Sequence, residues 1–193
     1  MSKLSATLPG IPQLCHMEKL SMDALQRLSL SDFKNREKLP LVVVLDNIRS
    51  ALNVGSIFRT ADAFALEQVV LCGITAQPPH REILKTALGS TDSVAWQYFS
   101  DTVEAIQQLQ KNGYTVLAVE QTTDKIWLQD FQPQLDGKYA FVMGNEVDGV
   151  DDQALKLCNG VVETPQFGTK HSLNVAVAAG IVVWEVVRKM KGK

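Results

Sequence analysis

The segment from residue 164 to residue 174 holds the side chains best suited to chemistry in this sequence. A loop containing Pro165 and Gly168 ends in Ser172-Leu173-Asn174 and runs directly into a long apolar segment. Hydroxyl and amide groups with small neighbours, held at the mouth of a buried element, suit a ligand site better than a hydrophobic core. The competing interpretation of Ser172 is local, because serine is a favoured N-cap residue at the start of a helix.

Asn53 and Arg59 are a second pair of candidates, on a segment predicted to be helical. This segment, Asn53–Phe64, follows the apolar run Leu41–Leu45. Asn53 is also a good N-cap residue, and Arg59 can equally be a solvated surface cation. Gly55 is unfavourable in a first helical turn, and the close approach of a substrate backbone or of a second chain would explain it. Arg59 stands out as a charge on a largely apolar helix.

Two acidic residues follow predicted strands and extend this set. Gly144-Asn145-Glu146 follows the apolar run Tyr139–Val142, and Glu120 follows Leu117–Val119. An open α/β sheet binds ligands outside the carboxyl ends of its strands, and glycines there allow the backbone to face a cofactor. As alternatives, Glu146 caps the next helix or pairs with a cation, and Glu120 is a solvated acid at a strand end.

The elements that must position these residues alternate along the chain. Short apolar runs rich in valine and aromatic residues predict strands buried on both faces. The expected strands are Leu41–Leu45, Val69–Cys72, Val94–Phe99, Thr115–Val119, Tyr139–Met143 and Val161–Glu163. The expected helices are Asn53–Ala65, Arg81–Leu88, Asp101–Lys111, Asp151–Leu157 and Ser172–Met190. This order predicts an α/β fold with a mostly parallel sheet and helices on both faces.

The C-terminal segment is apolar on nearly all sides. Its valines, Ile181 and Trp184 cannot share one face of a helix, so the helix must be buried on several sides. A partner subunit is the natural cover for such a helix at the end of a small domain, which predicts a homodimer. A membrane span is the competing interpretation, but Glu185 and Arg188 shorten the apolar run below about 18 residues.

Three polar segments resemble, in order and spacing, the motifs of the SpoU/TrmH family of S-adenosylmethionine-dependent RNA ribose 2′-O-methyltransferases, part of the knotted SPOUT class. They are Asn53–Phe64, Met143–Gly149 and Thr164–Gly180. The resemblance implies a C-terminal trefoil knot, a homodimer, S-adenosylmethionine as cofactor and RNA as substrate. We expect residues 39–193 to form the SPOUT methyltransferase domain. Residues 1–38 would be an N-terminal extension with a weak helical stretch around Met22–Leu30.

The resemblance also implies roles for individual residues. The catalytic residues would be Arg59, Asn53, Glu146, Ser172 and Asn174, and the cofactor-binding residues would be Glu120, Gly144, Thr164 and Leu173. In the family the arginine activates the methyl-accepting hydroxyl. Because a free guanidinium is almost always protonated, we expect Arg59 to orient that hydroxyl and an adjacent RNA phosphate. Thr164 departs from the family pattern, in which isoleucine is more common at this position.

The class of RNA is open between two branches of the family. The stretches Val119–Thr122 and Phe167–His171 resemble the branch that methylates a D-loop guanosine of tRNA, so we favour tRNA over ribosomal RNA. A non-catalytic RNA-binding module of the same fold is an alternative, although all five expected catalytic residues are present. A methyltransferase that acts on a small molecule or on a protein is a further alternative.

Composition and cysteine content limit the possible ligands and the expected cellular location of the protein. The formal net charge is −2, so affinity for RNA must come from local basic clusters such as Lys34, Arg36 and Lys38, or Lys170 with His171. The three cysteines are odd in number and show no metal-ligand spacing, which predicts a cytoplasmic protein without a structural zinc or other metal. No secretory signal is indicated. Glycine-rich dinucleotide and P-loop signatures are missing, which argues against a nicotinamide enzyme or an NTPase.

Overall fold

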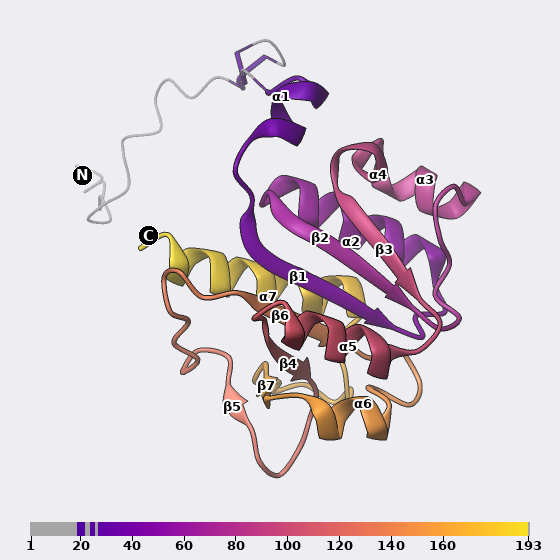
Figure 1. The fold of residues 1–193 in the computed structure, drawn as a ribbon, viewed down its shortest axis with the longest axis vertical. Coiled ribbons are helices and arrows are strands. Elements are labelled where there is room, and N and C mark those ends of the chain that lie inside the picture. The colour runs from indigo at the N-terminus through magenta and orange to yellow at the C-terminus, as the bar shows by residue number, and fades with distance from the viewer. Residues whose placement is uncertain (1–18, 22–23, 26, 193) are drawn as a thin grey trace, which may run out of the picture.

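The computed structural model of the protein describes residues 19–21, 24–25 and 27–192, and within these ranges all strands belong to one parallel sheet (Figure 1). The strands are β1 (Leu39–Asp46), β2 (Leu66–Cys72), β3 (Ala95–Phe99), β4 (Thr115–Val119), β5 (Ile126–Trp127), β6 (Tyr139–Met143) and β7 (Gly160–Glu163). Their order across the sheet is β3-β2-β1-β6-β4-β7-β5. The chain thus builds from β1 outward to β3 and later returns to the other side of β1, which creates a switch point in the middle of the sheet.

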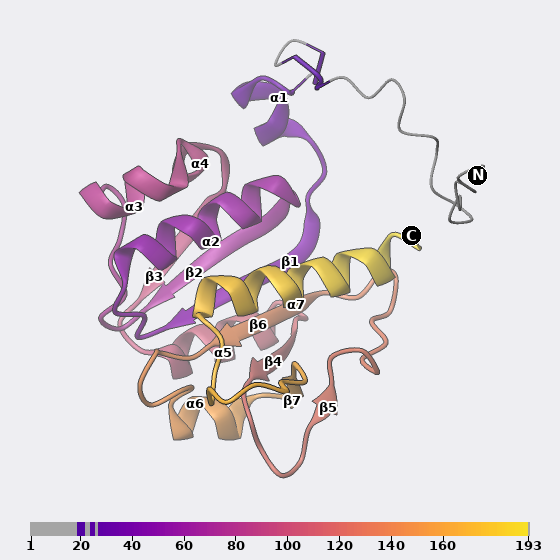
Figure 2. The same cartoon turned by 180° about the vertical axis from the view of Figure 1, so that it is seen from behind.

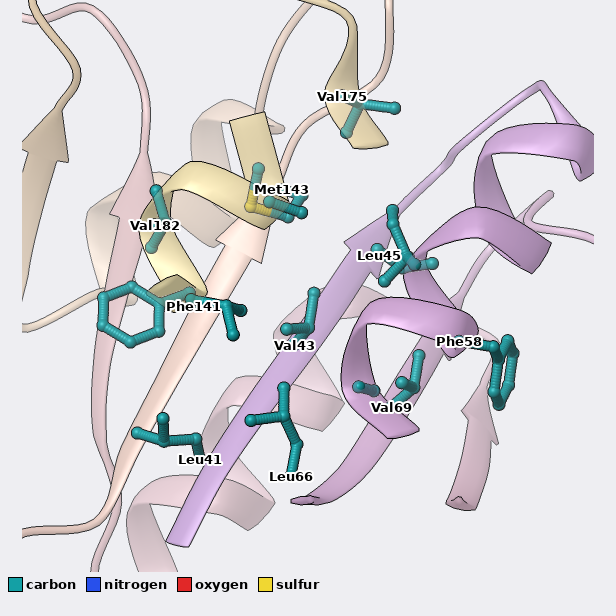
Figure 3. Close-up of a cluster of buried hydrophobic side chains, with 14 of the residues drawn as sticks. Leu41, Val43, Leu45, Phe58, Leu66, Val69, Phe141, Met143, Val175 and Val182 are labelled. Carbon is teal, nitrogen blue, oxygen red and sulfur yellow. The ribbon is translucent and has the colours of Figure 1, made fainter. Parts of the chain in front are cut away.

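Helices cover both faces of the sheet, as the sequence predicts (Figures 1 and 2). They are α1 (Leu30–Asn35), α2 (Ala51–Ala63), α3 (Arg81–Ala87), α4 (Ser90–Ser93), α5 (Thr102–Lys111), α6 (Asp152–Leu157) and α7 (Val175–Met190). Val43 of β1 belongs to the apolar cluster that contains Phe58 of α2 and Val182 of α7 (Figure 3), whereas the next residue, Val44, packs with Ile106 of α5. Full burial of each such side chain contributes about 1.5–3 kcal/mol.

The six strands expected from the sequence are all present, and the spans of β4 and β6 are those predicted. Three short elements, β5, α1 and α4, were not predicted, because segments of two to six residues carry too little periodicity. The helical stretch expected around Met22–Leu30 falls partly outside the described residues, and the described helix α1 begins only at Leu30.

Two helices begin at other residues than predicted, and the difference frees side chains for other contacts. The N-cap of α2 is Ser50, whose hydroxyl accepts a hydrogen bond from the Asn53 amide at 3.3 Å. The N-cap of α7 is Asn174, so Ser172 lies in the preceding loop. The alternative interpretation of Asn53 and of Ser172 as N-cap residues is therefore wrong.

Gly55 has a packing reason within the chain, because helix α3 lies directly against it. A Cβ atom at this position would overlap the Thr86 side chain and the Ile83 carbonyl of α3. The Thr86 hydroxyl donates to the carbonyl of Leu52 at 2.9 Å, which holds α3 against α2. The glycine in the first turns of α2 therefore allows two helices to approach closely.

One side of α7 packs on the sheet and the other side is open within a single chain. Val182 and Val186 are buried, whereas Val177, Ile181 and Trp184 are 51%, 37% and 55% exposed. These three side chains form an apolar stripe that the chain itself does not cover, as the sequence predicted for a helix with apolar residues all round. Among the helices of the described ranges, none has the length and apolar character needed to cross a membrane.

Candidate active site

Three loops meet at the carboxyl edge of the sheet and surround a hollow. They follow β4, β6 and β7, whose ends share one edge because the strands are parallel. The hollow, here called the edge hollow, has a volume of about 690 Å³, within the range of small-molecule sites. It is lined by residues 119–122, 144–150, 163, 164, 166 and 171–175, together with Asp152, Leu155 and Ala178.

A chain of side-chain hydrogen bonds joins the three polar segments at the lip of the edge hollow. The amide of Asn174 donates to Asn53 Oδ1 at 3.1 Å, and Asn53 Nδ2 donates to Glu146 Oε1 at 3.0 Å. The backbone amide of Arg49 donates to Glu146 Oε2 at 3.2 Å. The three residues are separated by 93 and 121 positions in sequence, so only the fold brings them together.

The surroundings of Glu146 keep its carboxylate charged. Partial burial raises the pKa of Glu146, but hydrogen bonds from its own amide, from Asn53 and from the amides of Arg49 and Ser50 outweigh burial, so the pKa is lowered. A carboxylate whose lone pairs accept this many donors is a poor proton acceptor. The geometry therefore suits a residue that organises the loops better than one that abstracts a proton.

The side-chain amide of Asn174 links two helices, because its oxygen and its nitrogen bind different partners. Its Oδ1 accepts from the amides of Ala176 and Val177 at 2.9 and 3.3 Å, which caps α7, while its Nδ2 reaches Asn53. The start of α7 and the first turn of α2 are consequently held in a fixed relation. Substituting either asparagine would release one helix from the other.

Gly144 is required by the shape of its own loop. A Cβ atom there would overlap the backbone of Gly149 and Val150. Asn145 and Gly149 exchange two backbone hydrogen bonds, at 3.0 and 3.2 Å, which folds the loop back on itself. A larger residue at position 144 would therefore open the loop before it met any ligand.

Glu120, expected to contact a cofactor, ties two loops together. Its carboxylate accepts from the amide of Val150 at 3.1 Å and from the amide of Gln121 at 2.8 Å. The side chain still lines the edge hollow, but both of its oxygens have a backbone partner. Glu120 thus shapes the wall of the hollow by holding the loop after β6 against the end of β4.

The remaining predicted residues lie in the loop that follows β7. Thr164, Ser172 and Leu173 all line the edge hollow. The side chain of Gln121 donates to the carbonyl of His171 at 2.5 Å, so the loop after β4 is linked to this one. Eight of the nine predicted site residues therefore lie in or at the rim of one hollow.

Arg59 is the ninth, and the structure does not bring it to the others. It is exposed on α2 and lines a different hollow of about 890 Å³, here called the arginine hollow, between α1, α2 and the turn from α3 to α4. Six residues separate Arg59 from Asn53, which amounts to about 9 Å along the helix and a rotation of about 240°. Helical geometry alone thus turns Arg59 away from the lip of the edge hollow.

Asp46 was not among the candidates, although it supports the site from behind. Its buried carboxylate accepts from Asn47 Nδ2 at 2.8 Å, from the Thr102 hydroxyl at 2.5 Å and from the amide of Asp151 at 2.8 Å. It thereby fixes the end of the loop after β6 to β1 and α5. The signal available in the sequence is an acidic residue directly after the apolar run of β1. In the part of the chain that the structure describes, no cluster of side chains suits a metal ion.

Known proteins are similar in sequence to most of this chain. A profile described as the SpoU rRNA Methylase family matches residues 40–184. The 23S rRNA (guanosine-2′-O-)-methyltransferase RlmB of Vibrio vulnificus is 30% identical over 160 residues, which cover 83% of this chain and 64% of that protein. The chain therefore matches slightly less than two thirds of the length of this relative.

Solved structures give the same picture. The SpoU methyltransferase AviRb from Streptomyces viridochromogenes, in complex with the cofactor AdoMet, superposes with a TM-score of 0.73 at 25% identity over 86% of this chain and 66% of that chain. The AdoMet-bound rRNA methyltransferase from Sinorhizobium meliloti gives 0.71 at 29% identity, over 85% and 61%.

Proposed function

The chain belongs to the SpoU rRNA Methylase family, and from this premise we propose that it transfers a methyl group from S-adenosylmethionine to a ribose 2′-hydroxyl of RNA. One structural observation supports the proposal in addition to family membership. The Asn174–Asn53–Glu146 chain assembles the three polar segments at the lip of a hollow large enough for a nucleoside cofactor.

The residues around the edge hollow fit S-adenosylmethionine. Backbone groups of the loops at Gly144, Thr164 and Leu173 would hold the nucleoside, since these loops line the hollow. Glu120 would act on the cofactor chiefly through the loop that it holds. Bound S-adenosylmethionine supplies a methyl group on a good leaving group. The protein must then align the acceptor oxygen with that methyl group.

The side chains at the lip would position the acceptor ribose. Asn53, Asn174 and Glu146 would fix the geometry of the loops, and the Ser172 hydroxyl would support the nucleophile. Glu146 would stay ionised and would not take the proton, because its lone pairs already accept hydrogen bonds. For Arg59 we keep the role of orienting the hydroxyl and a neighbouring phosphate, which accepts the proton. Within one chain this role requires the RNA to cross α2.

A homodimer is part of the proposal. The apolar stripe of Val177, Ile181 and Trp184 on α7 would be covered by a second copy. The trefoil knot that the family resemblance implies, and the division into residues 1–38 and 39–193, are retained as proposals. Light scattering at micromolar concentration should give twice the monomer mass, and a monomer would contradict the dimer.

Two RNA classes remain as substrates, each with its own support. The stretches around Glu120 and His171 resemble the tRNA branch, whereas the Vibrio vulnificus relative carries the name of a 23S rRNA enzyme. The deciding experiment offers labelled S-adenosylmethionine with unfractionated tRNA and, separately, with ribosomal RNA. Digestion to nucleosides and mass spectrometry should find a 2′-O-methylated nucleoside in one of them. The absence of methyl transfer to both RNAs by a protein that binds the cofactor would overturn the proposed function.

A further inference from the structure

The last turn of helix α7 is attached through Lys189 to the connection between β4 and β6. The Nζ atom of this lysine donates to the carbonyl oxygens of Leu128, Gln129 and Phe131 at 3.2, 2.6 and 2.7 Å. The same atom lies 3.0 Å from Glu185 Oε1, one turn earlier on the helix, and the lysine side chain is 10% exposed. An ammonium group has three donors, so this arrangement engages all of them.

The three carbonyl groups belong to a turn, residues 127–131, here called the carbonyl turn. The amides of Asp130 and Phe131 both donate to the carbonyl of Trp127, at 2.8 and 3.1 Å, which closes the turn. In both views of the fold, the chain after β5 reaches the C-terminal end of α7 before it returns to β6 (Figures 1 and 2). Carbonyl oxygens that converge on one point form a site for a cation, and here the protein itself supplies that cation.

The carbonyl turn also holds one wall of the edge hollow. The amide of Leu128 donates to the carbonyl of Glu163 at 2.8 Å, and Lys125 Nζ lies 2.8 Å from Glu163 Oε2. Trp127 pairs with Glu163 in the parallel ladder between β5 and β7. Glu163 and the next residue, Thr164, both line the edge hollow. The turn is therefore bound to this wall on one side and to α7 on the other.

Strand β5 by itself gives the connection little rigidity. It has two residues and lies at the edge of the sheet, beside β7. A strand this short at an edge is marginally stable without further contacts. The side chains of Leu128 and Phe131 are buried and determine where the turn lies. The ammonium group of Lys189 determines how the backbone of the turn is oriented, because it binds three carbonyl groups at once.

Glu185 holds the ammonium group from the helix and also binds a second cation, Arg188. Its carboxylate accepts from Arg188 Nε and Nη2 at 3.0 and 2.8 Å. Hydrogen bonds from Arg188 and then from Lys189 outweigh partial burial and lower the pKa of Glu185 to about 2, so the carboxylate is charged. Arg188 is 42% exposed and, among the described residues, has no bond to the carbonyl turn. Arg188 and Lys189 thus share one ion-pair partner and differ in their contact with the turn.

We propose that Lys189 is a positioning residue for the cofactor site. Its ammonium group orders the carbonyl turn, and the turn holds the wall of Glu163 and Thr164 in the geometry that binds S-adenosylmethionine. The proposal rests on the proposed function, in which the edge hollow takes the cofactor. Because coupling between two sites is reciprocal, cofactor binding must in turn stabilise the carbonyl turn. A lysine that served only the stability of the fold would show no such coupling.

The first test uses the wild-type protein and hydrogen exchange. Amide exchange is followed across the full chain with and without saturating S-adenosylhomocysteine. The amides of residues 127–131 should exchange more slowly in the complex, although these residues lie outside the lining of the edge hollow. Strand β3, at the opposite edge of the sheet, is the control and should be unchanged. Exchange in the carbonyl turn that does not respond to the cofactor would overturn the proposal.

The second test compares Lys189→Met with Arg188→Met in the full chain. Methionine keeps an apolar stem and removes the charge. By calorimetry, Lys189→Met should bind S-adenosylhomocysteine about tenfold more weakly, the equivalent of about one hydrogen bond to a charged group. Arg188→Met, which breaks an exposed ion pair, should change this affinity less than about twofold. The KM for S-adenosylmethionine should rise in Lys189→Met while kcat changes less than about twofold, as expected when binding alone is weakened.

Chemical rescue separates the ammonium group from a general loss of structure. Lys189→Ala lacks three carbons and the nitrogen of the side chain, which together correspond to propylammonium. Propylammonium chloride should restore the affinity of Lys189→Ala for S-adenosylhomocysteine. Tetramethylammonium chloride at the same ionic strength should not, because it has the charge but no hydrogen-bond donor. Neither salt should change the affinity of Arg188→Ala.

Equal affinities of Lys189→Met and Arg188→Met for S-adenosylhomocysteine would overturn the proposal, and so would a failure of propylammonium to act on Lys189→Ala. If neither lysine variant folds, hydrogen exchange in the wild type decides. A wild type that binds the cofactor but transfers no methyl group to RNA would contradict the proposed function alone, and the binding data would still test Lys189. A wild type that does not bind the cofactor would contradict both.

Discussion

Helix α2 contributes to the surroundings of both hollows, since Asn53 bonds to residues that line the edge hollow and Arg59 lines the arginine hollow, but the two hollows are built in opposite ways. At the edge hollow, polar side chains are engaged with one another: Glu146, Asn53 and Asn174 form a continuous chain of hydrogen bonds. At the arginine hollow, Arg36 and Arg59 are exposed and, among the described residues, have no ion-pair partner. The first arrangement fixes the positions of atoms, and the second leaves donors free for a partner.

The difference separates residues that hold a geometry from residues that attract a ligand. A hydrogen-bonded side chain is already positioned before any ligand arrives, which reduces the cost of ordering during binding. A free guanidinium contributes through charge and through contacts made only in the complex. Changes at the edge hollow should therefore affect stability and catalysis, and changes at the arginine hollow should affect RNA affinity.

The largest effect is expected at Asp46, behind the edge hollow. In Asp46→Asn the new amide would place a donor against the Asp151 amide or the Thr102 hydroxyl, and a charged hydrogen-bond acceptor would be lost. Urea denaturation should show a loss of roughly 2–3 kcal/mol in the free energy of unfolding. Asp92→Asn, at the exposed wall of the arginine hollow, is the control and should change it by less than about 0.5 kcal/mol. Equal losses of unfolding free energy in the two variants would contradict the proposed difference between the two hollows.

The second largest effect is expected from loss of the Glu146 carboxylate. Glu146→Gln keeps the shape but turns one acceptor into a donor that faces either the backbone amide of Arg49 or the side-chain amide of Asn53. Because the site is partly exposed, we expect a cost of roughly 2 kcal/mol, or about a 30-fold slower single-turnover methylation rate. Asp148→Asn, in the same loop, should retain nearly the full rate. A wild-type rate in Glu146→Gln would remove this residue from the organisation of the site.

The lowered pKa of Glu146 predicts how cofactor affinity changes at acidic pH. A carboxylate whose pKa is lowered on folding stabilises the folded loop at pH values above its ordinary pKa, and this contribution is lost as pH falls through the lowered value. Affinity for S-adenosylhomocysteine should therefore hold as pH drops past the usual range of a glutamate and decline only below it. In Glu146→Gln the contribution of this group to the acid dependence should disappear. An affinity that declines at the ordinary glutamate pKa would contradict the shift.

The smallest effect on stability is expected at Arg59. Arg59→Ala removes an exposed side chain that lines the arginine hollow, so the free energy of unfolding should change by less than about 0.5 kcal/mol. Cofactor affinity should also be unchanged, while RNA binding and methyl transfer decline. Isothermal calorimetry with S-adenosylhomocysteine, run beside an RNA-binding measurement, distinguishes a change in cofactor affinity from a change in RNA affinity. A parallel loss of cofactor affinity would show that Arg59 belongs to the edge hollow after all.

Much of the fold could be predicted because its strands are short, apolar and buried on both faces. The runs that became β1, β4 and β6 carry this signal without reference to any other part of the chain. The two-residue strand β5 could not be predicted, since it is defined only by pairing with β7. For the site, position after a strand identified Glu146, and position before an apolar segment identified Asn174, but neither signal revealed that Asn53 forms hydrogen bonds with both.

The sequence by itself determined the element order, the two-faced burial of the strands and the residues able to do chemistry. These properties depend on local periodicity and residue type, which the chain carries at every position. Tertiary structure alone decided that β6 returns beside β1, that α3 is the reason for Gly55, and that Arg59 faces away from its expected partners. Each depends on contacts between residues far apart in sequence, or on which side of a helix faces a neighbouring element. The separation into two hollows therefore arises in the folded chain, where one helix carries Asn53 and Arg59 on different sides.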